Sequence, residues 1–328
     1  MNQHISFLTV IIMCFLICGT AQAIVQYTVT DLGTLGGASS YANGINASGQ
    51  VVGYSYIIGD ADDHAFLYNG STMTDLGTLG GTYSLALGIN DSGQVVGWAQ
   101  TTENGPSHAF LYSGSTMKDL GTLGGIDSEA YGINASGQVV GYSYIIGDAH
   151  NHAFLYNGST MNDLGTLGGR DSVALGINDS GQIVGTAETT TNAVSHAFLY
   201  NGSTMKDLGT LGGTNSVAYG INASGQVVGW AYTNGGIEHA LLYSSSTLID
   251  LNTLIDPSSG WKLQAASGIN DAGQIVGGGF IEGSGYNGNA YHAFLLTPVP
   301  EPSTLVLFGI GVIGLICYTW RRRKLLMG

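Results

Sequence analysis

Short runs of apolar residues alternating with polar ones recur along this chain in groups of four, and the groups repeat every 44 residues. In one copy the runs span residues 84–90, 94–99, 108–112 and 115–120, and they are rich in Val, Ile, Leu, Phe and Tyr. Such runs predict β-strands, and the Asp-Ser-Gly and Ser-Gly segments between them predict tight turns. No helix-length periodic segment lies between Ile24 and Pro298, so this region is predicted to be all-β.

Repeated motifs fix the boundaries of the 44-residue unit. Asp-Leu-Gly-Thr-Leu-Gly-Gly begins at Asp31, Asp75, Asp119, Asp163 and Asp207. His-Ala-Phe-Leu-Tyr begins at His64, His108, His152 and His196, with variants at His239 and His292. A fixed period of this size indicates stacked or radially arranged units that share one core.

The number of strands at the two ends favours a closed ring. Four strands in about 44 residues is the size of one β-propeller blade. Residues 27–35 match a fourth strand without its first three, whereas 266–270, 274–280 and 292–296 match three strands without a fourth. We therefore predict a six-bladed β-propeller over residues 24–298, its last blade closed by the N-terminal strand. A linear β-solenoid with two turns of 22 residues per unit is the alternative.

The N-terminal residues 1–23 are typical of a signal peptide. An apolar stretch covers Phe7–Cys18, and Ala21 and Ala23 form a small-x-small cleavage site before Ile24. All three cysteines lie in the hydrophobic ends of the chain, so the exported region is predicted to contain no disulfide.

The C-terminal residues 299–328 combine three elements. Val299, Pro300, Glu301 and Pro302 precede an apolar segment at 304–320, and a basic tail follows at 321–324. Sixteen apolar residues at ~1.5 Å each reach ~24 Å, slightly less than the ~30 Å hydrocarbon core, which predicts a short transmembrane helix. The order of the three elements resembles the PEP-CTERM sorting signal. That resemblance implies a Gram-negative bacterium, recognition by an exosortase at the inner membrane, and release to the cell surface or extracellular matrix.

Charge excludes one class of partner. Residues 24–298 contain 21 Asp and Glu but four Lys and Arg, a net charge of −17. Nucleic acid is an unfavourable ligand for such a surface, because binding it requires Lys and Arg to displace counterions.

The repeated motifs also resemble the HAF-repeat family of bacterial extracellular proteins. The resemblance spans nearly the whole exported region and rests on His-Ala-Phe, Gly-Ile-Asn-x-Ser-Gly-Gln and Asp-Leu-Gly-Thr-Leu. It implies a secreted repeat protein, and it provides no catalytic residue to transfer to this chain.

Residues that repeat in every unit are predicted to build the fold, and function is sought where the copies differ. The repeated histidines fit hydrogen bonds to Asp or Ser better than a metal site, because symmetry separates them. The variable links after the second strand lie beside aromatic residues, which suit stacking on sugars. These candidate binding residues are Tyr56, Tyr144, Trp98, Trp230 and Tyr232; packing between blades is the alternative for the same side chains.

One acidic loop is a candidate calcium site. Asp60, Asp62 and Asp63 cluster within four residues, and calcium prefers carboxylate oxygens in a flexible loop. The loop lacks the spacing of an EF-hand, so solvated acids are the competing interpretation, and no other cofactor is predicted.

The sequence thus predicts a non-catalytic surface or matrix protein that functions in adhesion, matrix organisation or polysaccharide binding. The alternative is a secreted propeller hydrolase that acts on extracellular glycan. A hydrolase would place unrepeated glutamates in one deep pocket with Lys262 and Arg170, whereas a binding protein would present equivalent shallow sites. The unrepeated glutamates are Glu103, Glu129, Glu188, Glu238 and Glu282.

Overall fold

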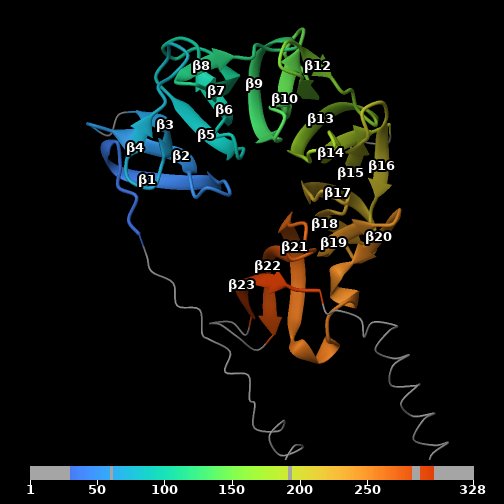
Figure 1. Ribbon diagram of the computed structural model, residues 1–328. Helices are drawn as coiled ribbons and strands as arrows, with labels where there is room; N and C mark the ends of the chain where they lie inside the picture. Colours follow the sequence, from blue (N-terminus) through green and yellow to red (C-terminus); the bar gives the residue numbers. More distant parts are fainter. Residues whose placement is uncertain (1–29, 60–61, 191–193, 283–288, 299–328) are drawn as a thin grey trace, which may run out of the picture. The chain divides into compact units, whose positions relative to one another are not determined.

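The computed structural model describes residues 30–59, 62–190, 194–282 and 289–298, which form six antiparallel β-sheets in chain order (Figure 1). The first sheet contains β1 (Gly36–Ile45), β2 (Val51–Ile57), β3 (Asp63–Tyr68) and β4 (Met73–Asp75). The second contains β5 (Ser84–Ile89), β6 (Val95–Gln100), β7 (Ser107–Ser113) and β8 (Thr116–Asp119). The third contains β9 (Gly124–Ile133), β10 (Val139–Ile145), β11 (Asn151–Tyr156) and β12 (Met161–Asp163).

The remaining sheets continue the same order. The fourth contains β13 (Gly168–Ile177), β14 (Ile183–Thr189), β15 (Ser195–Tyr200) and β16 (Met205–Gly209). The fifth contains β17 (Gly212–Ile221), β18 (Val227–Thr233), β19 (Glu238–Ser244) and β20 (Thr247–Asp250). The short 3₁₀ helices η1 (Leu251–Thr253) and η2 (Pro257–Ser259) lead to a sixth sheet of β21 (Trp261–Ile269), β22 (Ile275–Glu282) and β23 (Asn289–Leu296). The predictions of an all-β fold and of repeated four-stranded units are confirmed.

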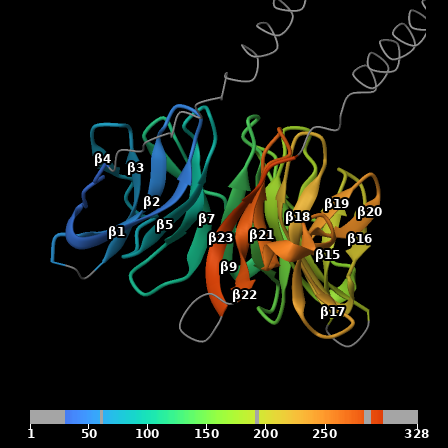
Figure 2. The ribbon, with the colours of Figure 1, turned by 90° about the horizontal axis from the view of Figure 1, so that it is seen from below.

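Consecutive sheets pack face to face around apolar side chains. Val52 and Ala65 of the first sheet share a cluster with Val95 and Phe110 of the second, and all four are fully buried. The same cluster recurs at each later pair of neighbouring sheets. The first strands of consecutive sheets, such as β5 and β9, also contact each other. Figure 2 shows the sheets from below. Each sheet therefore buries both faces only when it has a neighbour on each side.

The predicted closing strand is not confirmed. The sixth sheet has three strands, Thr30–Thr34 belong to no strand, and Leu35 forms an isolated bridge with Ile57 of the first sheet. Residues 27–29, which complete the predicted strand, lie outside the described residues. The chain divides into two compact units, 1–33 and 34–328, and all six sheets belong to the second unit.

The predicted terminal segments also lie outside the described residues. This applies to the signal peptide 1–23 with Ala21 and Ala23, and to residues 299–328 with the helix expected at 304–320. Across the part of the chain that the structure describes, no helix is long and apolar enough to cross a membrane.

One glycine in the second strand of each sheet is required by a close backbone contact. A Cβ placed on Gly97 would lie 1.9 Å from the carbonyl oxygen of Leu85, across the bulge between β5 and β6. Because that oxygen belongs to the backbone of a paired strand, the clash cannot be relieved by a side-chain rotation.

We expect Gly97→Ala to lower the free energy of unfolding by ~3 kcal/mol, because both strands must separate to admit the methyl group. Gly235→Ala is the matched control, since its Cβ would meet no atom closer than 3.8 Å. Urea denaturation followed by circular dichroism measures both variants. Equal stability of the two would contradict this explanation of the repeated glycine.

Candidate functional site

The repeated histidine and the repeated aspartate form a pair within each four-stranded sheet. In the second sheet, His108 Nδ1 lies 2.9 Å from Asp119 Oδ2, and the backbone N–H of Gly121 donates to Asp119 Oδ1 over 2.7 Å. Equivalent pairs join the following residues: His64 and Asp75, His152 and Asp163, His196 and Asp207, and His239 and Asp250. The aspartate thus holds the imidazole and closes the turn that follows the fourth strand.

A buried serine extends this network to the next sheet. Ser128 of β9 accepts a hydrogen bond from the backbone N–H of Ala109 over 2.8 Å and donates to the carbonyl oxygen of Gly121 over 2.7 Å. The same two hydrogen bonds, to the equivalent alanine N–H and glycine carbonyl oxygen of the preceding unit, are made by Ser84, Ser172 and Ser216. The His, Asp, Gly and Ser of the motifs therefore form one structural unit that links neighbouring sheets.

Among the described residues, no group of three or more His, Cys, Asp or Glu side chains is placed to hold a metal ion. Of the candidate calcium ligands, Asp60 lies outside the described residues, whereas Asp62 and Asp63 are described. Burial raises the pKa of the Asp63 carboxyl, and the neighbouring charge of Asp62 acts in the same direction. The calcium site stays a prediction.

The candidate aromatic residues lie on the second strands, half-buried. Tyr142 and Tyr144 make an edge contact with ring centroids 6.1 Å apart, and Trp230 and Tyr232 make one at 5.2 Å. Tyr56 and Trp98 occupy the equivalent positions of β2 and β6. These side chains are grouped within each sheet rather than brought to a single point.

A second feature of the aromatic positions is their association with carboxylates. The Tyr131 hydroxyl donates to Glu129 Oε2 over 2.9 Å. Burial, together with the charge of Glu129, raises the pKa of both Tyr131 and Tyr142 well above the usual tyrosine range. In the fifth sheet a hydrogen bond to Glu238 raises the pKa of Tyr232. These tyrosines stay neutral hydrogen-bonding groups at physiological pH.

Grooves recur between sheets at the level of the His–Asp pairs. Between the fourth and fifth sheets, one of about 520 Å³ is lined by His196, Asp207, Gly213 and Thr214. Between the fifth and sixth, a cavity of about 410 Å³ occupies the equivalent place and includes Glu238 and Lys262. Arg170 does not line it. The unrepeated residues expected of a hydrolase are thus brought together only in part.

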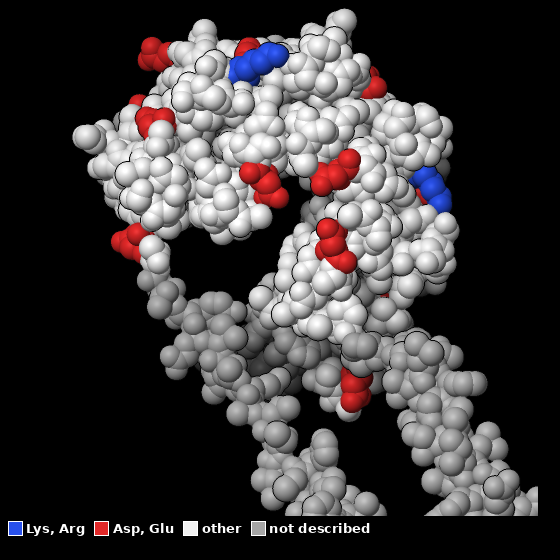
Figure 3. Space-filling model, in the orientation of Figure 1, with Lys and Arg blue, Asp and Glu red and all other residues white. Residues whose placement is uncertain are grey.

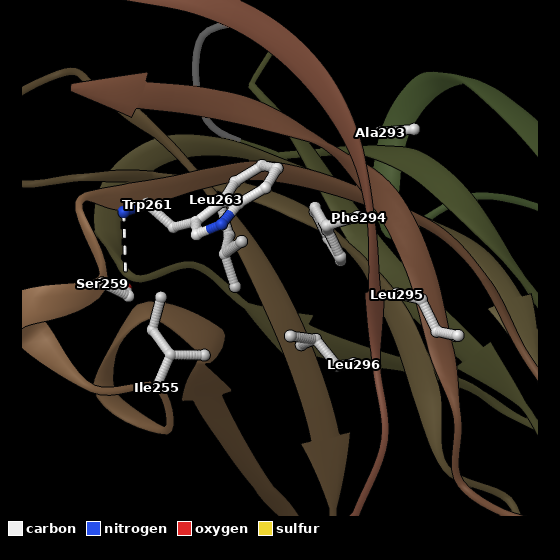
Figure 4. A pocket seen from close by; sticks show the side chains of 8 residues that line it. All are labelled: Ile255, Ser259, Trp261, Leu263, Ala293, Phe294, Leu295 and Leu296. Atoms are coloured by element: carbon white, nitrogen blue, oxygen red, sulfur yellow. Dashed lines mark hydrogen bonds between the residues drawn. The ribbon is translucent and has the colours of Figure 1, made fainter. Parts of the chain in front are cut away.

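A third pocket, of about 250 Å³, is mainly apolar. Trp261 and Leu263 of β21 face Phe294 and Leu296 of β23, with Ile255 from the preceding turn (Figure 4). Acidic side chains are scattered over the face drawn in Figure 3 and are not gathered in one patch there.

Two family models match the chain. Residues 298–324 match the PEP-CTERM protein-sorting motif, which confirms the sorting signal predicted from Pro300, Glu301 and Pro302. Residues 127–304, more than half of the chain, match a family described as a protein of unknown function (DUF3466). The chain belongs to the DUF3466 family. The PEP-CTERM motif marks this DUF3466 protein for export and for processing by an exosortase. The HAF-repeat resemblance stays a prediction.

Other comparisons of this DUF3466 chain show distant similarity. No curated protein matches it. TolB from Acinetobacter baumannii is 14% identical, with a TM-score of 0.43 over 63% of this chain, which spans about half (52%) of TolB. The β-propeller domain of the Trilobed protease from Pyrococcus furiosus is 8% identical, with a TM-score of 0.46 over 80% of this chain and 86% of that domain. The Aleuria aurantia lectin AAL is 15% identical, with a TM-score of 0.36 over 63% of this chain and 74% of the lectin chain. These similarities carry no argument about function.

We expect Ser128→Ala to lower the free energy of unfolding by ~2 kcal/mol, because it leaves the buried N–H of Ala109 and the half-buried carbonyl of Gly121 without this partner. Ser113→Ala is the control, since Ser113 is exposed at the end of β7. Chemical denaturation compares the two variants. A Ser128→Ala protein as stable as the control would show that the serine does not link the sheets.

Proposed function

We propose that this DUF3466 protein is delivered to the cell surface or extracellular matrix, where it binds polysaccharide without catalysing a reaction. The carrying observation is the recurrence of one His–Asp junction along consecutive sheets. Aromatic side chains stand on the adjoining second strand in the first, second, third and fifth sheets. A repetitive polymer can occupy several such places on one molecule, so weak individual contacts add up through multivalency.

The aromatic positions support this proposal. Tyrosine recurs at the end of the second strand in alternate sheets, as Tyr56, Tyr144 and Tyr232. All three rings are half-buried, which leaves part of each available for contact with the apolar face of a sugar. A hydrolase of extracellular glycan is the competing function, favoured by the presence of Glu238 and Lys262 in one cavity.

We further propose that the six sheets close into a six-bladed propeller through the N-terminal strand. In each His–Asp pair the aspartate follows the histidine by eleven positions, but the residue eleven positions after His292 is Ser303. The aspartate that begins the same motif without a preceding histidine is Asp31, near the N-terminus. On the sixth sheet, Val276 and Leu295 are 46% and 60% exposed, although Val228, the equivalent of Val276, is fully buried. We infer that the first sheet covers this face once the N-terminal strand completes the sixth sheet.

Binding is tested with the full-length protein on an array of bacterial polysaccharides and oligosaccharides, with and without calcium. We expect reproducible binding that the double variant Tyr56→Ala/Tyr144→Ala weakens by at least tenfold, because two stacking surfaces are lost, each worth ~1 kcal/mol. Tyr68→Ala, on a third strand, is the control. If no glycan binds, the proposed function is wrong, and hydrolysis of the same glycans is then measured.

Closure is tested by a disulfide. The pairing of Leu67 with Thr74 in the first sheet predicts that Leu295 would pair with Thr30. In a chain whose native cysteines are replaced by alanine, Thr30→Cys/Leu295→Cys is therefore expected to form an intramolecular disulfide on oxidation. Mass spectrometry of the digested protein detects it. An intermolecular disulfide would show instead that the strand pairs with a second copy, and no disulfide would contradict closure.

A further inference from the structure

The cavity between the fifth and sixth sheets differs chemically from every equivalent junction. Its volume is about 410 Å³, and the residues that line it include Glu238, His239, Asn252, Lys262, Gln264 and Phe280. This volume lies within the range of small-molecule sites, ~300–1,000 Å³. The residues come from β19, η1, β21 and β22, so both sheets and their connection build the site.

The differences are substitutions within the repeat. In the sixth sheet Leu263 pairs with Gly279, as Ser216 pairs with Ala231 in the fifth, so the linking serine is lost and Gln264 lies at the register shift that follows. Asn252 stands where the other junctions have the glycine that follows Asp-Leu. Lys262 pairs with Phe280 near the start of β21, and both residues line the cavity. The glycine and the serine of an ordinary junction are thus absent here, and longer polar side chains line the cavity.

These side chains are held in place by hydrogen bonds. Gln264 Nε2 donates to Glu238 Oε2 over 2.9 Å, which joins the two sheets in place of the serine. Asn252 donates to the carbonyl oxygen of Leu263 over 2.9 Å and accepts from its N–H over 2.8 Å. His239 Nδ1 lies 2.6 Å from Asp250 Oδ2. Positioned polar groups of this kind bind a ligand with little loss of side-chain entropy.

The set of groups fits a hydroxyl-rich ligand. A carboxylate accepts hydrogen bonds from sugar hydroxyls, carboxamides both donate and accept, and an ammonium group donates. The ring of Phe280 adds an apolar wall beside them, held by an edge contact with Tyr291 at 5.1 Å. Glu238 and Asp250 outnumber Lys262 in charge, so an anionic sugar is disfavoured relative to a neutral one.

We propose that this cavity binds a neutral hexose unit of an extracellular polysaccharide. The inference rests on the proposed polysaccharide-binding function and assigns it one asymmetric site beside the repeated aromatic ones. Binding would require Glu238 to accept from the sugar hydroxyls and Gln264 to keep the carboxylate oriented.

The test is isothermal titration calorimetry of the full-length protein with methyl glycosides of glucose, galactose, mannose and glucuronic acid. We expect at least one neutral glycoside to bind and the glucuronide to bind more weakly. Glu238→Gln, which retains the shape but removes the charge, is expected to weaken binding at least tenfold. Gln264→Ser, which removes the amide that donates to Glu238, is expected to weaken it as well.

Glu188→Gln is the matched control, because Glu188 lies outside this cavity and its carboxylate accepts from the backbone N–H of Arg170. Circular dichroism verifies that each variant is folded. Wild-type binding that Glu238→Gln and Gln264→Ser leave unchanged would overturn this inference. It would leave the proposed function intact if the array still shows binding that depends on Tyr56 and Tyr144. Absence of binding both to the glycosides and to the array would overturn both proposals.

Discussion

The contact on which the repeated architecture depends is an asparagine amide that joins each sheet to the next. Asn90 Nδ2 donates to Gln94 Oε1 in its own turn over 2.8 Å and to the carbonyl oxygen of Asn134, one unit further on, over 3.0 Å. Asn90 Oδ1 accepts from the backbone N–H of Gln94 over 3.0 Å. The same bonds link Asn46, Asn134, Asn178 and Asn222 to their successors. Both N–H groups and the oxygen of this amide form hydrogen bonds. A different spacing between the sheets would break the bond to the next sheet, and a buried polar group without a partner costs ~1–3 kcal/mol.

This constraint explains why the strands could be predicted closely from the sequence. The run predicted at 84–90 is observed as β5 (Ser84–Ile89), and that predicted at 94–99 as β6 (Val95–Gln100). Asparagine, glycine and glutamine recur at fixed positions because each makes a specific turn contact, so they mark strand ends in the printed sequence. The fourth strands were harder to delimit, since β4 ends at Asp75 and the following Leu76 packs into the core without forming a strand.

The functional residues could be predicted less well, for a physical reason. Periodicity identifies a residue that repeats, but the side chains of a cavity are defined by what two different sheets bring together. Glu238 and Lys262 were visible as unrepeated charged residues, whereas Asn252 and Gln264 were missed. The available signal was the loss of the glycine after Asp-Leu, where Asn252 stands, and of the linking serine beside Gln264. This loss indicates a changed junction only when the hydrogen bond from Ser216 to the carbonyl oxygen of Gly209 in a regular junction is known.

The junction that lost its serine is also the one where the period changes. The amide of Asn222 reaches Asn270, 48 residues on, instead of the 44 that separate all earlier partners. The additional chain is accommodated by η2, so the asparagine contact is retained while the rest of the junction is free to vary. The asparagine amide therefore keeps neighbouring sheets aligned at one end of their strands. A polar cavity can form beside the His–Asp pair without changing how the two sheets pack. Asymmetry in an otherwise regular protein arises here at the junction where the serine link is replaced and the asparagine link is kept.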